Sequence, residues 1–320
     1  MTRTIDAPPA SALARFGWHR PLLWLSLGMI LLAATALVGL VIDQRILTGM
    51  PLWAKPLKFS LSVLIYSVTL SWLLGQLPRG RRLAWWAGTI AAVFLAVELI
   101  VIYVAAFADT TSHFNVSTPF STAVWGTMAV SIVIVWAATI LVAVLLFRAE
   151  LGDPARSFAI RSGLIIAVIG MGLAFLMTSP TAAQLSNFQG IAGAHTVGLS
   201  DGGPGLPLLG WSTVAGDLRS PHFVGIHGMQ VIPIVALLLD LASRRISVLR
   251  NSRTRRGILV VTTVLYLGVI AVLTVQALSG ESIVRPDAGI ATVSTTLFLA
   301  AAVACAAIVV RGRRARVSDL

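Results

Sequence analysis

The sequence predicts an all-α membrane protein with eight transmembrane helices, and its composition, its long apolar stretches and the distribution of its charges indicate this fold class. Of 320 residues, 57% are hydrophobic and only 11% are charged, and the mean hydropathy is +0.89. An ordinary soluble domain carries about 25% charged residues, and a globule of this size cannot hide so much apolar surface from water. We therefore expect one integral membrane domain over residues 1–320.

Each predicted helix is an apolar stretch long enough to cross a bilayer. About 20 residues, each rising about 1.5 Å, cross about 30 Å of hydrocarbon. The stretches lack the alternation of strands, and lipid offers no partner for unpaired backbone groups, so we expect helices. The predicted spans are 22–42, 57–76, 84–106, 122–147, 162–178, 223–242, 257–278 and 289–310.

The basic residues predict that both termini are cytoplasmic, because cytoplasmic loops carry an excess of Lys and Arg. With this orientation 19 of the 24 basic residues, including Arg3 and Arg15, lie on the cytoplasmic side and 5 on the outer side. The net charge of +12 then indicates contact with anionic lipid headgroups of the bilayer and no nucleic-acid partner. The first apolar run is longer than the core of a cleavable signal peptide, so we expect it to be retained as a membrane anchor.

Cysteine content and loop length narrow the prediction further. The single cysteine, Cys305, excludes a disulfide framework, a structural zinc knuckle and covalent c-type haem attachment. The longest connection between spans, residues 179–222, contains several Gly-Pro turns. Structureless loops of this length are uncommon and often functional, so we expect an ordered loop that caps the outer side.

Polar residues gather near the outer ends of the predicted spans, and they define the predicted site. Glu98 lies about 12 Å below the outer surface of the third span, where an unpaired charge is costly. We expect it either to stay protonated or to be ionised and pair with Lys58 or His227. The predicted catalytic residues are Glu98, Lys55 and Lys58, the cofactor-binding residues are Arg219, Gln230 and Asn115, and the metal ligands are His113, His195, His222 and His227.

Most of these residues also have a purely structural interpretation, and for His113 and His195 it is a solvated loop residue and a turn cap, respectively. Glu98 can be a hydrogen-bonded packing residue, and the lysines can reach toward headgroups. His227 and Gln230 share a helical face beside Gly225 and Gly228, which suits close packing as well as ligation. His222 and His227 are five residues apart, so they converge only if His222 lies at or before the helix start.

Several stretches resemble a family of bacterial multi-pass membrane proteins. They are MPLWAKPLKFS (50–60), SHFN (112–115), GAHTVG (193–198), DGGPGLPLLGWS (201–212) and GDLRSPHFVGIHGMQ (216–230). The resemblance covers most of the chain and implies a multi-pass protein of the bacterial cytoplasmic membrane. It implies no activity and no catalytic residue.

Three functions fit these residues. Four histidines in one layer can hold haem b, copper, zinc or iron for redox or metal-assisted chemistry on a small molecule at the outer side. A small-solute transporter is the second possibility, although such proteins place broken helices and binding groups near the midplane. The third is a metal-free enzyme that holds a lipid or polyprenyl phosphate through Lys55, Lys58 or Arg219.

Overall fold

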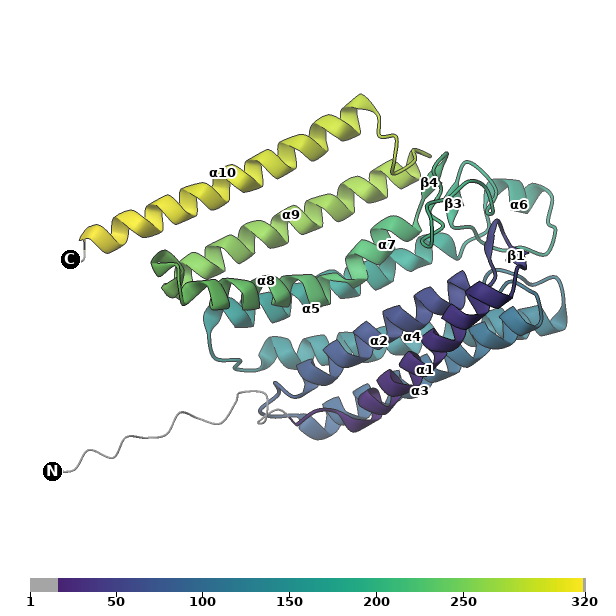
Figure 1. Cartoon of the computed structure of the whole chain (residues 1–320), viewed down its shortest axis with the longest axis horizontal. Helices are drawn as coiled ribbons and strands as arrows, with labels where there is room; N and C mark the ends of the chain where they lie inside the picture. Colours follow the sequence, from purple (N-terminus) through teal and green to yellow (C-terminus); the bar gives the residue numbers. More distant parts are fainter. Residues whose placement is uncertain (1–16, 319–320) are drawn as a thin grey trace.

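The computed structural model describes residues 17–318, and it is a bundle of long helices that lie side by side along one direction (Figure 1). Seven helices are long and apolar enough to cross a membrane, or up to eight spans if one bent pair of helices counts as a span. Arg3 and Arg15, which the predicted topology counts as cytoplasmic, lie outside the described residues. The structure thus confirms a mostly helical fold with seven or eight candidate membrane spans.

The first five long helices correspond to the first five predicted spans. The fifth begins eight residues before the predicted start, because the Asp153 carboxylate accepts hydrogen bonds from the backbone of Ala155 and Arg156 and Pro154 occupies the first turn. The bounds are α1 Arg20–Ile42, α2 Ala54–Leu74, α3 Arg81–Phe107, α4 Pro119–Arg148 and α5 Pro154–Gly172, which continues as the 3-10 turn η2 Leu173–Met177.

The sixth predicted span, 223–242, is not one continuous helix. Two helices, α7 Arg219–Ile226 and α8 Gly228–Ser243, meet at an angle of 44°. After the turn η3 Ser247–Arg250, the chain continues in α9 Ser252–Leu278 and α10 Ala288–Ser318. α10 packs along α9 at the edge of the bundle (Figure 1), and its apolar stretch is not buried by the protein.

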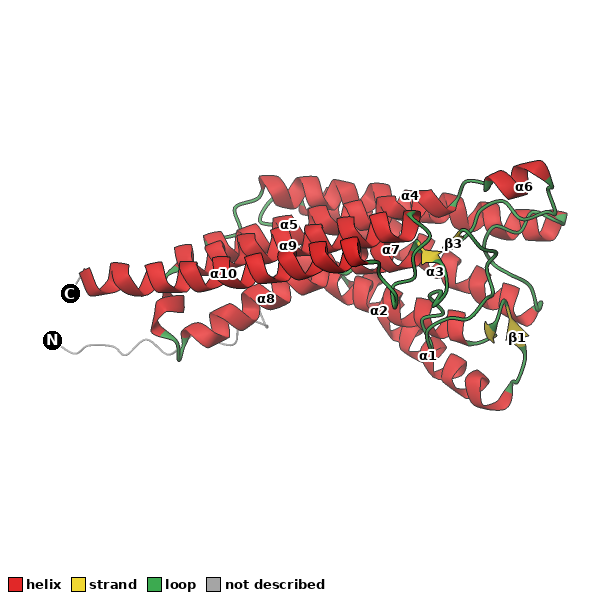
Figure 2. Ribbon diagram, turned by 90° about the horizontal axis from the view of Figure 1, so that it is seen from above, coloured by secondary structure: helices red, strands yellow, loops and turns green. Residues whose placement is uncertain are grey.

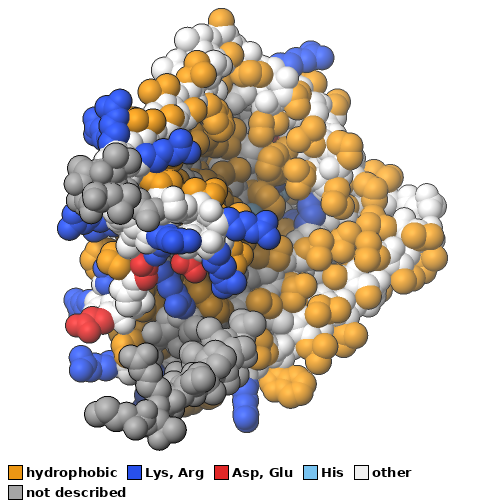
Figure 3. Space-filling view, turned by 60° about the vertical axis from the view of Figure 1, so that its left-hand side comes forward, with side chains coloured by type: hydrophobic (Ala, Val, Ile, Leu, Met, Phe, Trp, Pro, Cys, Tyr) orange, Lys and Arg blue, Asp and Glu red, His pale blue; other side chains and the backbone are white. Residues whose placement is uncertain are grey.

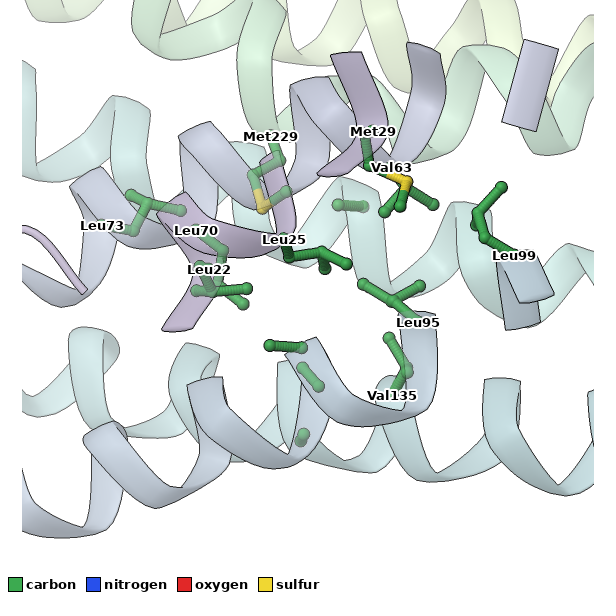
Figure 4. Packing of buried hydrophobic residues seen from close by; sticks show 14 of the residues in the cluster. Leu22, Leu25, Met29, Val63, Leu70, Leu73, Leu95, Leu99, Val135 and Met229 are labelled. Atoms are coloured by element: carbon green, nitrogen blue, oxygen red, sulfur yellow. The ribbon is translucent and has the colours of Figure 1, made fainter. Parts of the chain in front are cut away.

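The core lies between α1, α2, α3, α4 and α5, and Figure 4 shows its side chains. Leu22, Leu70 and Leu99 are almost fully buried there, and Met229 reaches the same cluster from α8. A second cluster joins α5 with α8 and α9 through Ile166, Ile232 and Leu259. Because lipid is as apolar as these side chains, close packing and polar contacts between the helices stabilise the bundle.

The two ends of the bundle differ in composition. The end that carries the α2–α3, α4–α5 and α8–α9 connections is called the arginine end here, and Figure 3 shows its Arg side chains crowded together beside a hydrophobic flank. The opposite end carries His113, His195, His222 and His227 and is called the histidine end. It is the broader end of the molecule, and connecting loops lie across it (Figure 2).

Short elements organise the loops of the histidine end. The α1–α2 connection forms the antiparallel pair β1 Ile46–Leu47 and β2 Met50–Pro51. Residues 178–218, called the connecting segment here, contain α6 Ala182–Ser186 and the antiparallel pair β3 Thr196–Val197 and β4 Gly216–Asp217. The connecting segment is therefore held by backbone pairing rather than being structureless.

Candidate functional site

Histidines from four separate segments meet at the histidine end. His113 lies between α3 and α4, His195 directly precedes β3, His222 lies in α7, and His227 occupies the break between α7 and α8. The rings of His113 and His195 are 6.2 Å apart, and His222 interacts electrostatically with both His195 and His227. The structure thus places all four predicted ligands, each half-buried, at the same end, but His222 lies within α7 rather than at or before its start, and no three of the described side chains converge on one metal position.

His113 is held as a neutral ring that accepts a hydrogen bond. The Lys55 Nζ atom lies 3.0 Å from His113 Nδ1, and the Ser112 hydroxyl lies at the same distance. Burial, reinforced by the nearby Lys55, His195 and His222, holds the pKa of His113 well below its usual range. An ammonium can only donate, so Nδ1 is the acceptor and the ring proton lies on Nε2.

His195 has the opposite tautomer because its partner is a carboxylate. Asp201 Oδ2 lies 2.5 Å from His195 Nδ1, and Asp201 also accepts from the backbone N–H and hydroxyl of Thr196. Burial opposes ionisation of Asp201, but the bonds from His195 and Thr196 outweigh it and hold its pKa below the usual range. Burial also lowers the pKa of His195, so its ring is neutral, donates from Nδ1 and has a lone pair on Nε2.

His222 and His227 have the same tautomer as His195. The Nδ1 atom of His222 lies 2.7 Å from the Gly170 carbonyl oxygen, which can only accept. The Nδ1 atom of His227 lies 3.3 Å from Gln230 Oε1, and the amide of Gln230 donates in turn to the Thr69 hydroxyl at 3.2 Å. Both rings therefore donate from Nδ1.

All four rings share one property. Within the described residues, each Nδ1 atom has a hydrogen-bond partner and no Nε2 atom has one. In His195, His222 and His227 the free Nε2 carries a lone pair, whereas in His113 it carries a proton. Metal-bound histidines in proteins typically donate their second ring N–H to a carboxylate or a backbone carbonyl, as His195 and His222 do here.

The break between α7 and α8 places His227 at its position. A Cβ atom on Gly170 of α5 would collide with the backbone of Gly225, and one on Gly228 would collide with the Ile166 side chain. The Tyr266 hydroxyl donates to the Val224 carbonyl at 2.6 Å, one turn before the break. The glycines thus provide the space for the bend inside the bundle. The Tyr266 hydroxyl satisfies a backbone carbonyl there, which would be costly to leave without a partner.

Glu98 is buried, with 5% of its surface exposed, and its Oε2 atom has no hydrogen-bond partner among the described residues. It lies nine residues before the end of α3, or about 14 Å below it. The cation with which it interacts is Lys55, not the predicted Lys58 or His227. Lys58 has a different partner, because its Nζ atom donates a hydrogen bond to the Leu209 carbonyl at 2.7 Å.

The remaining predicted residues hold the loops. Arg219 pairs with Asp217 at 2.6 Å and donates to the Gly210 carbonyl, while Asn115 accepts from the Ser117 backbone and hydroxyl within its own turn. Asp201 was missing from the predicted site, because DGGPG is typical of a turn and gives no indication that its aspartate binds a histidine ring. The contact between His195 and Asp201 spans only six residues of one loop.

Among the residues that the structure describes, no three His, Cys, Asp or Glu side chains are arranged to hold a metal ion. The chain matches no protein-family model, and neither a curated protein nor a solved structure is significantly similar to it. The family resemblance and the roles assigned to the site residues therefore stay predictions.

Proposed function

We propose that this protein binds a metal centre, in the form of haem or of a metal ion, at its histidine end and uses it for redox or metal-assisted chemistry. In this proposal the arginine end faces the bacterial cytoplasm and the histidine end faces the outer side of the membrane. One observation supports it above all: His195, His222 and His227 each donate from Nδ1 and keep a free lone pair on Nε2.

Haem suits this donor set better than a closed zinc site. A structural zinc ion takes four protein ligands and a catalytic one takes three, and no such group occurs among the described residues. Haem supplies four nitrogen ligands of its own and needs only one or two histidines. In this proposal His113, with its proton on Nε2, donates a hydrogen bond to a bound molecule and is not a ligand.

The experiment is reconstitution of the purified chain with haem b and, separately, with copper, zinc and iron. Binding of one of them should be lost or its spectrum changed in His222→Ala and in His227→Ala. His19→Ala is the control, because His19 lies at the arginine end, where it caps α1 and bonds to the Trp85 carbonyl. Unchanged binding in His195→Ala, His222→Ala and His227→Ala alike would contradict the proposal.

The broken span favours a small-solute transporter as the second candidate. Discontinuous helices form the binding sites of many transporters, and His227 lies at such a break about 12 Å below the start of α7. Proton flux into proteoliposomes, followed with a pH-sensitive dye, tests this alternative. A flux that is lost in His227→Ala, in protein that binds no metal, would favour transport.

A further inference from the structure

Lys55 and Lys58 are the only lysines in a sequence that carries 24 basic residues. The other basic residues are arginines, which remain protonated in proteins, whereas a partly buried lysine can lose its proton. Both lysines lie in the first two turns of α2 at the histidine end. A site that required only positive charge would be equally well served by arginine, so this placement favours the chemistry of an amine.

The two lysines have different surroundings. Lys58 is tied to the Leu209 carbonyl of the connecting segment. The Lys55 ammonium donates a hydrogen bond to the neutral His113 ring, and its Nζ atom lies 5.9 Å from the centre of the Phe59 ring. Within the described part of the chain, no carboxylate oxygen lies within 4 Å of the Lys55 Nζ atom. The nearby charges of Lys58 and Arg219 repel its ammonium form. Lysines in such apolar, cation-flanked positions serve as nucleophiles in enzymes.

We propose that Lys55 is a nucleophilic amine that forms an imine with a small aldehyde or ketone at the histidine end. The Lys55 ammonium gives a proton to His113 Nδ1, and the nitrogen lone pair forms a bond to the carbonyl carbon. A proton passes from nitrogen to the carbonyl oxygen, His113 returns its proton to the resulting hydroxyl, and water leaves. One ammonium and one carbonyl compound thus yield one protonated imine and one water.

When it is ionised, Glu98 is the counter-charge for this product. It interacts electrostatically with Lys55, and its Oε2 atom has no hydrogen-bond partner among the described residues. A carboxylate in this position stabilises a protonated imine without competing as a direct ion pair for the free ammonium. The reaction uses no metal, so this proposal can be tested independently of the proposed haem or metal site.

Reductive trapping tests the proposal. The purified full chain is incubated near neutral pH with pyridoxal and sodium cyanoborohydride, and peptide mass mapping then locates the reduced adduct. We expect Lys55 to react at least about tenfold faster than Lys58, and the rate to saturate with pyridoxal concentration. Labelling without added metal separates this result from a failure of the metal proposal.

Three variants make the test specific. Lys55→Arg should abolish the fast adduct, Lys58→Arg should retain it on Lys55, and His113→Phe should slow it to the rate of Lys58. Helical circular dichroism and size-exclusion profiles confirm that each variant is folded. Equal labelling of both lysines, a rate that does not saturate, or full reactivity in His113→Phe would overturn the proposal.

Discussion

At the scale of single residues, the partner of each Nδ1 atom decides what the opposite side of the ring can do. Asp201 and the Gly170 carbonyl accept from His195 and His222, so the Nε2 lone pairs of these rings are available to a ligand. Lys55 donates to His113, so that ring presents a proton instead. Four residues of one type thus divide into two chemical roles.

Asp201→Asn should weaken the binding of haem or metal by about 10–100-fold, because partners of this kind orient the histidine and raise its basicity. Titration of the purified variant with the cofactor measures the change. Asp240→Asn is the matched control, since Asp240 lies near the arginine end and, among the described residues, its carboxylate pairs with Arg255 alone, at 3.9 Å. Equal affinity in the two variants would show that Asp201 merely holds its loop.

Glu98→Gln should leave the protein folded and inserted while strongly reducing activity or ligand binding. Glu98→Leu should also fold, with a melting temperature equal to or above that of the wild type, because no described residue relies on this carboxylate as a hydrogen-bond partner. Thermal melting in detergent, combined with the binding assay, measures both effects. If Glu98→Leu unfolds the protein while Glu98→Gln retains full activity, Glu98 is a structural residue.

At the scale of elements, the sequence predicts where the helices are better than how they bend. Seven of the predicted spans coincide with helices because long apolar runs have few alternatives in lipid. The division of the sixth span into α7 and α8 could not be predicted, although Gly225, Gly228 and Pro233 are visible in the sequence. Such residues also occur in unbroken membrane helices, and the contact with Gly170 of α5 exists only in the folded bundle.

Gly170→Ala should destabilise the bundle by about 1–3 kcal/mol, because its methyl group has no space against the Gly225 backbone. Binding at the His222–His227 segment should weaken with it. Gly126→Ala in α4 is the control, because no atom lies within 4 Å of its added Cβ, and it should be neutral or stabilising by up to about 1 kcal/mol. Similar melting temperatures for the two variants would contradict the close crossing of α5 and α7.

At the scale of the whole molecule, arginines are concentrated at one end of the bundle and four histidines lie at the other, so the two ends differ in their chemistry. The histidines could be assigned to one end from the order of the spans, but their pairing could not. His195 contacts Asp201 through a turn, and His222 bonds to a carbonyl 52 residues away in the sequence. The first contact depends on the conformation of one loop and the second on how α5 and α7 cross, and hydropathy encodes neither.

Reporter fusions test this polarity. Fusions after Arg82, Arg161 and Arg256 should report the cytoplasm, and fusions at Asn115 and Gly203 should report the outer side. The expectation rests on the 19 basic residues assigned to one side against 5 on the other. A cytoplasmic signal at Gly203 would invert the orientation and place the histidine end inside the cell.

The most direct test of the central claim is the absorption spectrum of the wild-type protein, purified without added cofactor and combined with elemental analysis. The proposal predicts a Soret band with stoichiometric iron or, without haem, a stoichiometric amount of copper, zinc or iron. The signature should disappear or shift in His227→Ala and remain in His19→Ala. A protein that is folded, free of metal and haem, and unable to bind either on reconstitution would contradict the claim.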